Sequence, residues 1–300
     1  MRIGTRGSVL ALAQARWVAD RIHGPAELVT ITTSGDRGQQ VGDKARWVSA
    51  LERALLDGEI DCAVHSAKDV PAELPDGLAL VAFPERANPF DAICGAPSLA
   101  ALPAGARLGT SSLRRAAQVR AHRDDVEVVE IRGNVDTRLR KLAAGEVDAL
   151  ILARAGLERL GRAGEAGGSL EALVPAAGQG ALAIEARDSA EAAAALAALD
   201  DPATSLCVLA ERELVHALGA SCNTPVGAHA RLVDGGELEL RAWAGLPDGS
   251  AWVADQLRGS PRGLGAEVAR RMQAAGAAEL LEAAEAAANA GLAAPGGERR

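Results

Sequence analysis

The sequence predicts an α/β fold with two lobes and a small C-terminal α+β domain, on three observations. Short apolar runs alternate with amphipathic helical stretches over the first half of the chain, which is typical of βαβ units and mixed, mainly parallel sheets. A Gly-punctuated turn and an apolar run at 175–188 suggest that the chain crosses back to its first lobe there. The pattern then changes to a helix, a hairpin and Ala-rich helices. We expect a first lobe of residues 1–86 and 181–200, a second of residues 87–180, and a third domain of residues 201–300.

The first strand is expected in MRIGT, and a turn after it starts a helix. Ser8 is a favourable N-cap for a helix over about residues 9–21. The free backbone N–H groups of a helix start, with Arg6 beside them, favour an anion. An ordinary capped helix without a ligand is the alternative.

A strand at 27–33, a polar Gly-rich segment at 34–46 and an amphipathic helix at 47–58 come next. The middle segment shows no periodicity, so we expect a loop over a site. The helix should end at Gly58.

The most informative stretch is IDCAVHSAKDVP, residues 60–71. Its apolar run predicts a buried strand that ends at His65 and Ser66. Polar residues at the carboxyl end of such a strand lie where open α/β sheets bind ligands. Lys68 and Asp69 therefore place a cation and an acid at this edge, although a solvated loop after a core strand is the alternative. Another strand is expected at 78–85.

One arrangement recurs in the second lobe: a strand ends, a Ser or Asn caps a helix, and Arg lies at the junction. The strands are expected at 106–110, at 126–134 and at the start of 147–161. Because βα junctions of a parallel sheet share one edge, the arginines should converge on one cleft. A guanidinium group binds both oxygens of a carboxylate, so a poly-carboxylate or phosphate ligand is predicted. A solvated helix residue is the alternative for any one of them. They are Arg114, Arg115, Arg132, Arg138 and Arg159.

The third domain should begin with a helix over 201–218, followed by a loop that carries Cys222. A hairpin turning at Asp234, Gly235 and Gly236 follows. A further strand and Ala-rich helices to about residue 291 complete the expected α+β domain.

Composition limits the class of protein. The chain has 300 residues, 48% of them hydrophobic, which allows a sizeable core. A net charge of −8 argues against general nucleic-acid binding, and no apolar stretch of ~20 residues predicts a membrane crossing. The four cysteines form no CxxC pair, so we expect no metal site and no disulfide framework. These features favour a reducing, cytoplasmic location.

Motifs along nearly the whole chain resemble one family, porphobilinogen deaminase (hydroxymethylbilane synthase). In order they are TRGS, AVHSAKDVP, GTSSLRRAAQ, IRGNVDTRL, DALILARAGLERLG, PAAGQGALAIE and SCNTPVG. The resemblance implies two lobes like type II periplasmic binding proteins and a third domain with a cofactor-bearing Cys. It also implies a transferase that joins four porphobilinogen molecules head to tail, losing ammonia each time, and releases hydroxymethylbilane by hydrolysis in tetrapyrrole biosynthesis. Each pyrrole ring bears acetate and propionate groups, and these carboxylates would explain why several arginines converge on one cleft.

The resemblance further implies residue roles. Asp69 would be the catalytic carboxylate, and Cys222 would hold a dipyrromethane cofactor through a thioether bond. A buried free thiol is the alternative for Cys222, and the one we favour for Cys62 within its strand. We expect a monomer whose partner is the small molecule porphobilinogen. The cofactor-binding residues would be Lys68, Ser112, Arg114, Arg115 and Arg132, and the substrate-binding residues Arg6, Ser8, Arg138 and Arg159.

The sequence departs from the family pattern mainly around the loop at 34–46. Ser34 stands where the family commonly has Arg, and the segment 44–52 lacks a Lys and a Gly, with Arg46 as a substitute cation. Ala220 and Ser221 replace a Gly pair before the Cys. These changes concern the predicted lid and leave the proposed catalytic residues in place.

A non-catalytic two-lobe binding protein for a poly-carboxylate ligand is the alternative function, because fold does not determine function. Such a protein would need the arginine cleft but neither Cys222 nor Asp69. The intact mass of the chain, with or without two added pyrrole units, separates the two.

Overall fold

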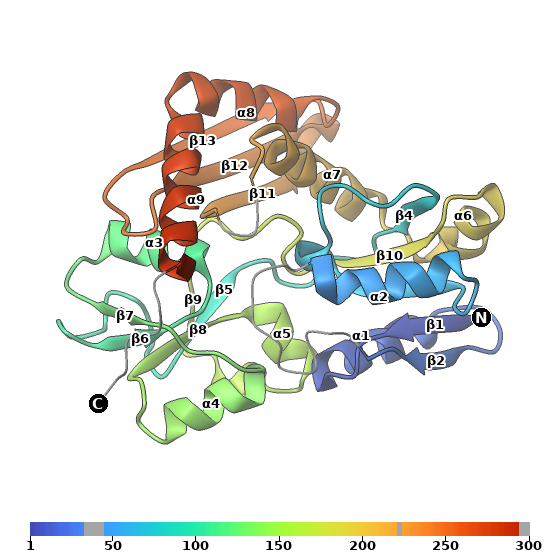
Figure 1. The fold of residues 1–300 in the computed structure, drawn as a ribbon, viewed down its shortest axis with the longest axis horizontal. Helices are drawn as coiled ribbons and strands as arrows, with labels where there is room; N and C mark the ends of the chain where they lie inside the picture. Colours follow the sequence, from blue (N-terminus) through green and yellow to red (C-terminus); the bar gives the residue numbers. More distant parts are fainter. Residues whose placement is uncertain (33–44, 221–223, 294–300) are drawn as a thin grey trace.

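The structure is a computed structural model that describes residues 1–32, 45–220 and 224–293. Three parts surround a common junction, each built on its own sheet (Figure 1). Two of the sheets have five strands and one has three. The predicted α/β class, with two lobes and a small C-terminal α+β part, is confirmed. The boundaries expected between the three domains stay a prediction.

Lobe one is the sheet with strand order β2-β1-β3-β10-β4 and its helices. Strand β1 pairs in parallel with β2 and β3, whereas β10 runs antiparallel between β3 and β4. The chain therefore returns to this lobe after building the other one, as predicted from the apolar run at 181–186. The elements are β1 (Arg2–Thr5), α1 (Val9–Ala19), β2 (Glu27–Thr30), α2 (Ala45–Leu56), β3 (Cys62–Ser66), η2 (Ala67–Asp69), β4 (Leu78–Ala82), β10 (Leu182–Arg187), α6 (Ala190–Leu196) and η4 (Ala197–Leu199).

Lobe two has the equivalent order, β7-β6-β8-β5-β9, with β5 as the antiparallel insertion. The predicted helix caps are confirmed, since the side chains of Ser112 and Asn134 accept hydrogen bonds from the N–H groups of Arg115 and Thr137. Strands β5 and β9 were not predicted. The elements are β5 (Asp91–Cys94), β6 (Arg107–Gly109), α3 (Leu113–His122), β7 (Glu127–Val129), α4 (Val135–Ala143), β8 (Ala149–Ala153), α5 (Arg154–Arg159), η3 (Ala163–Glu165) and β9 (Gly168–Ser169).

The third domain is an antiparallel sheet, β11-β12-β13, covered on one face by helices. Leu240 of β12, Val268 and Met272 of α8 and Leu214 of α7 share its buried core. Helix α7 lies between this sheet and lobe one (Figure 1). The elements are α7 (Pro202–Ala217), β11 (Val226–Leu232), η5 (Asp234–Gly236), β12 (Leu238–Gly245), β13 (Trp252–Gly259), α8 (Leu264–Ala274) and α9 (Ala277–Ala293).

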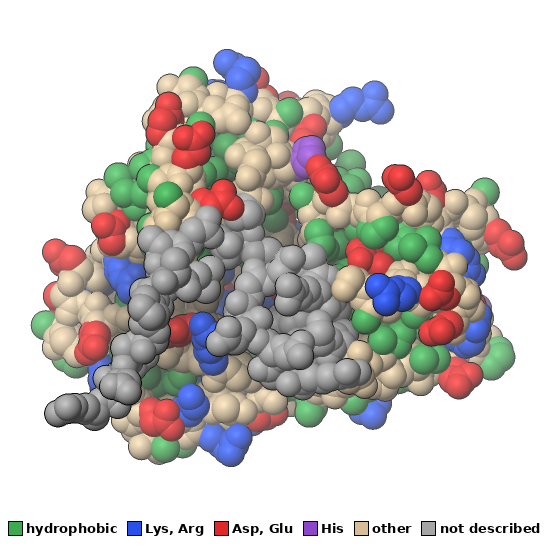
Figure 2. All heavy atoms as spheres, in the orientation of Figure 1, with side chains coloured by type: hydrophobic (Ala, Val, Ile, Leu, Met, Phe, Trp, Pro, Cys, Tyr) green, Lys and Arg blue, Asp and Glu red, His purple; other side chains and the backbone are tan. Residues whose placement is uncertain are grey.

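Acidic and basic side chains are interspersed over the face drawn in Figure 2, as a net charge of −8 on a chain rich in both signs would produce.

Among the helices that the structure describes, none alone is long and apolar enough to cross a bilayer. Residues 190–199 and 202–217 meet that test only when joined across a bend of 115°.

The other face of the third-domain sheet packs on the junction of the lobes. Trp243 is buried against Ala117 and Val174 of lobe two. The ring of His229 lies 5.3 Å from the ring of Phe90, in the segment that leads into β5. His229 is buried, and this burial lowers its pKa to about 4, an effect that Glu211 opposes and Arg86 reinforces.

We expect His229 to make the free energy of unfolding depend on pH. Its pKa is depressed in the folded state, so near pH 6.5 the unfolded chain takes up a proton that the folded chain does not. Stability should therefore fall as the pH is lowered, with about 2 kcal/mol lost between pH 7.5 and 5. In urea unfolding of His229→Gln, the decrease in the free energy of unfolding between pH 7.5 and 5 should be smaller by about 2 kcal/mol. His122→Gln, which changes an exposed histidine, should show the same decrease as wild type. An equal loss in His229→Gln and wild type would show that His229 is not its source.

Candidate active site

Asp69 lies on a short turn directly after the central strand of lobe one. Strand β3 ends at Ser66, and η2 carries Lys68 and Asp69 at the carboxyl end of the strand. We call residues 66–72 the Asp69 turn. The Ala67 N–H donates to the Ala181 carbonyl at 3.1 Å. Gly178, with φ +70°, approaches so closely that an added Cβ would lie 2.9 Å from the Ala67 Cβ. The turn is therefore held tightly against residues 175–181, which lead from lobe two back to lobe one and which we call the crossing segment.

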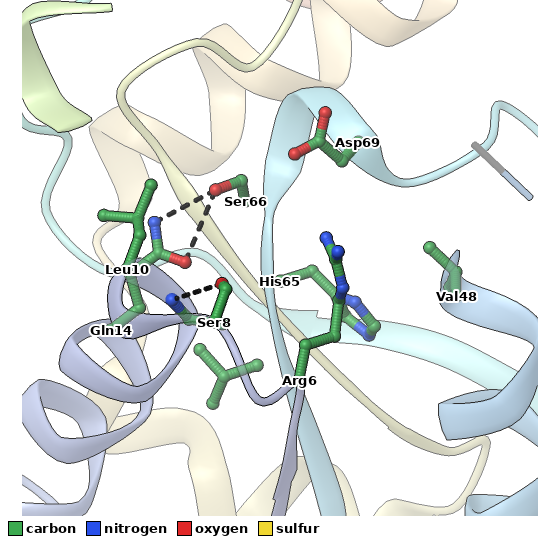
Figure 3. A pocket seen from close by; sticks show the side chains of 10 residues that line it. Arg6, Ser8, Leu10, Gln14, Val48, His65, Ser66 and Asp69 are labelled. Atoms are coloured by element: carbon green, nitrogen blue, oxygen red, sulfur yellow. Dashed lines mark hydrogen bonds between the residues drawn. The ribbon is translucent and has the colours of Figure 1, made fainter. Parts of the chain in front are cut away.

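A pocket opens beside this turn (Figure 3). Arg6 enters it from the end of β1, Ser8 from the start of α1, and Asp69 from its turn. The Ser8 hydroxyl accepts the Ala11 N–H, as an N-cap does. Three of the predicted site residues therefore share one pocket.

The wall of the pocket is fixed by polar pairs below it. The Gln14 amide of α1 donates to the Ser66 hydroxyl at 3.0 Å. His65, which also lines the pocket, pairs with the buried Glu185 of β10 at 2.9 Å. These contacts join α1, β3 and β10, so the pocket is built on the rigid centre of lobe one.

Lys68 is linked to lobe two through Gln179 of the crossing segment. The Lys68 ammonium donates to Gln179 Oε1 at 3.3 Å. The Gln179 amide nitrogen in turn donates to Asp91 Oδ1 and to the Pro89 carbonyl, each at 2.8 Å. One buried amide thus connects the Asp69 turn to the first strand of lobe two.

Arg114 and Arg115 both lie against Asp91, a contact that the sequence did not predict. Their guanidinium groups lie 2.8 and 2.7 Å from the Asp91 carboxylate. That they also bind the carboxylates of a ligand stays a prediction. All three side chains are buried. Although burial alone would raise the pKa of Asp91, the two cations hold it well below its usual value.

Arg138 lies beside this group. Its guanidinium donates to the Gly133 carbonyl and to the Ser111 hydroxyl, next to the Ser112 cap. Burial, and secondly the charge of Arg115, lower the pKa of Arg138. Within the part of the chain that the structure describes, Asp91 is the carboxylate that forms ion pairs with Arg114 and Arg115, and Arg138 lies beside them, so this side of the junction carries an excess of positive charge. Such an excess favours anionic ligands.

The remaining two arginines lie apart from each other. Arg159 donates to the Gly180 carbonyl at 2.6 Å, and burial lowers its pKa to about 10, so it is protonated at neutral pH. Arg132 has a side chain that is 60% exposed and pairs with the equally exposed Glu130.

Cys222 and residues 34–44 of the loop predicted at 34–46 lie outside the described residues. Cys62, Cys94 and Cys207 are described, and all are buried. Burial raises the pKa values of their thiols to about 12, 11 and 11. Because the thiolate is the nucleophile, these three side chains are poorly suited to covalent attachment.

Several polar residues of the junction were not singled out from the sequence. Gln179 lies within the quoted motif PAAGQGALAIE, which was a usable signal, whereas Asp91 lies in a strand that was not predicted. Arg86 and Glu211 form a nearly buried ion pair at 2.6 Å across the junction.

Among the described residues, no group of three or more His, Cys, Asp or Glu is arranged to hold a metal ion.

Comparisons with known proteins agree over most of the chain. The family described as "Porphobilinogen deaminase, dipyromethane cofactor binding domain" matches residues 1–195, and "Porphobilinogen deaminase, C-terminal domain" matches residues 205–274. A porphobilinogen deaminase of Brevibacillus brevis is 46% identical over 93% of this chain and 96% of its own. One from Deinococcus radiodurans is 45% identical over 94% and 97%, and one from a Caulobacter species is 50% identical over 83% and 85%.

Among solved structures, immunogenic lipoprotein A from Vibrio vulnificus superposes with a TM-score of 0.42 at 15% identity, over 68% of this chain and 96% of the other.

Proposed function

Because the chain belongs to the porphobilinogen deaminase family, we propose which of its residues carry out the family's reaction. The chain is a transferase of tetrapyrrole biosynthesis that polymerises porphobilinogen, and its cofactor is a dipyrromethane. The observation that carries our proposal is the pocket in which Asp69, Arg6 and Ser8 meet at a strand end. Nothing favours the alternative, a non-catalytic binding protein.

Asp69 is proposed as the catalytic carboxylate. When porphobilinogen loses ammonia, positive charge develops and is delocalised onto the pyrrole nitrogen. A carboxylate held at the pocket wall stabilises that charge more in the transition state than in the ground state, which is the condition for acceleration. The attachments of the Asp69 turn to Ala181 and Gly178 limit how far this carboxylate can move.

The substrate carboxylates are proposed to bind around Asp69. Arg6 and the N-terminus of α1 at Ser8 supply a cation and oriented N–H groups on one side of the pocket. Arg138 and Arg159 supply partly buried positive charge on the side of the junction. Porphobilinogen carries an acetate and a propionate, so two separate cationic positions suit it.

The cofactor is proposed to bind across the junction, attached to Cys222. Bound there, a dipyrromethane supplies the pyrrole carbon to which the first substrate unit is joined. The excess of positive charge near Arg115 suits its four carboxylates, and the buried state of the other three cysteines supports Cys222 as the anchor. The proposed binding residues are Lys68, Ser112, Arg114, Arg115 and Arg132, with Arg114 and Arg115 also holding Asp91.

The finer expectations from the sequence also stay proposals. We propose a cytoplasmic monomer without a nucleic-acid or membrane partner. The net charge of −8 argues against nucleic acid as a partner. We also propose the domain division 1–86 with 181–200, 87–180 and 201–300. Light scattering during size-exclusion chromatography tests the monomer, and a mass of two chains would contradict it.

Product and ammonia analysis tests the function itself. The purified chain should release one ammonia for each porphobilinogen consumed and one linear tetrapyrrole for every four. A protein that only binds would leave porphobilinogen unchanged. Binding without ammonia release would therefore support the alternative.

Arg132→Leu tests the most exposed of the proposed cofactor contacts. Hydrogen bonds from a charged group contribute roughly 1.5–3 kcal/mol, and the lower end applies to an exposed side chain that already pairs with Glu130. We expect about a tenfold loss in kcat/KM or in cofactor loading. Arg140→Leu, on the exposed side of α4, should change neither kcat/KM nor cofactor loading. Equal kinetics and equal loading in Arg132→Leu and wild type would remove Arg132 from the site.

A further inference from the structure

Arg212 of α7 binds the main chain of the Asp69 turn from the third-domain side. Its Nη1 donates to the Val70 carbonyl at 3.1 Å, and its Nη2 donates to the carbonyls of Pro71 and Ala72 at 2.6 and 3.1 Å. These are the three residues that follow Asp69. A planar guanidinium group that binds three consecutive carbonyls restrains both the position and the direction of the chain.

An apolar contact from the same helix face accompanies these hydrogen bonds. Val208 lies four residues before Arg212, so the two side chains project from α7 on one side. Val208 is fully buried in a cluster that contains Ala67 and Val70, the residues two before and one after Asp69. Helix α7 therefore hydrogen-bonds to the main chain that follows Asp69 and shares an apolar cluster with residues on both sides of it.

Helix α7 is itself firmly held. Its Cys207, Ala210 and Leu214 belong to the third-domain core. The buried Glu211, adjacent to Arg212, accepts the N–H groups of Gly178 and Ala230 at 2.6 and 2.7 Å. The helix is thus tied to the β-sheet of the third domain and to the crossing segment. It ends at Ala217, shortly before Cys222 in the sequence.

We infer that Arg212 is a positioning residue, which fixes the Asp69 carboxylate relative to the helix that leads to the Cys222 segment. The inference rests on the proposed catalytic role of Asp69. Rates depend steeply on placement, because a shift of about 1 Å costs roughly 100-fold in rate. Restraint of the turn from the third domain keeps the carboxylate aligned with groups held on that domain.

Arg212→Leu tests this inference, with Arg212→Lys as the conservative variant. At equal cofactor content, measured by intact mass, kcat of Arg212→Leu should fall about tenfold or more while KM changes less than about twofold. Lysine reaches fewer of the three carbonyls, so it should restore part of kcat. Arg270→Leu removes an exposed Arg on α8 that pairs with Glu267, and this variant should match wild type. All assays are run at a temperature where urea titration shows each variant to be folded.

A double-mutant cycle with Asp69→Glu separates positioning from a merely structural role. If Arg212 acts by placing Asp69, its replacement should cost much less once the carboxylate has already been displaced. Multiplicative effects, or an unchanged kcat in Arg212→Leu, would overturn the inference. Should Arg212→Leu fail to fold, Arg212→Lys enters the same cycle. Full activity of Asp69→Asn would instead contradict the proposed role of Asp69, so the two failures are distinguishable.

Discussion

Cys222→Ser should leave the chain folded but without cofactor and without measurable turnover. The change is nearly isosteric, and a hydroxyl is a far weaker nucleophile than a thiolate at neutral pH. Intact mass should therefore equal that of the bare polypeptide after expression in a host that makes porphobilinogen. Turnover should fall to background, because the first substrate unit has nothing to join.

Cys207→Ala is the matched control for this result. Cys207 is buried in the third-domain core, and burial raises the pKa of its thiol to about 11. Its replacement should leave cofactor loading intact. A normal thioether-linked mass in Cys222→Ser would show that another cysteine is the anchor.

Asp69→Asn should keep the cofactor and still bind porphobilinogen, while turnover falls by about 100-fold or more. The amide preserves shape and one acceptor but removes the charge that stabilises the developing cation, and losses of this order follow removal of such groups. Asp69→Glu keeps the charge and displaces it by about one methylene, so it should retain more activity than the amide. Single-turnover ammonia release, from protein whose cofactor content is known by mass, measures both.

Asp76→Asn, an exposed carboxylate a few residues beyond the turn, should release ammonia at the wild-type rate. Near-wild-type release from Asp69→Asn would make Asp69 a structural residue of the strand end. Asp61 would then be a poor substitute, because it lies before β3, at the other end of the strand, and pairs with Arg2 at 2.7 Å.

The strands that the sequence predicted best are those with long apolar runs, such as β3 and β8. Strand β5 was missed because its four residues pair antiparallel with strands far along the chain, and nothing local requires that pairing. The expected strand at 126–134 is only Glu127–Val129, since the chain turns toward the Asn134 cap soon after it. Helix caps were predicted well because a cap depends on residues only three apart.

The residues of the site also fall into those that the sequence predicted and those that it could not. Asp69, Arg6 and Ser8 were predictable because each follows a strand, and strand order alone brings them to one edge. That Arg114 and Arg115 contact Asp91 was not predictable, because the partner lies 23 and 24 residues away on the missed strand. Gln179 and Arg212 act through main-chain and amide contacts between different parts of the molecule, which no local pattern of residue types indicates.

Intact mass before and after addition of porphobilinogen tests the central claim most directly, namely that this chain builds its product on a covalently held cofactor. We predict the polypeptide mass plus two pyrrole units at rest, and stepwise additions of further units when porphobilinogen is supplied in small excess. Asp69→Asn should show the resting mass but acquire further units at least about 100-fold more slowly. A resting mass equal to the bare polypeptide, with no added units while porphobilinogen still binds, would contradict the claim and identify a binding protein.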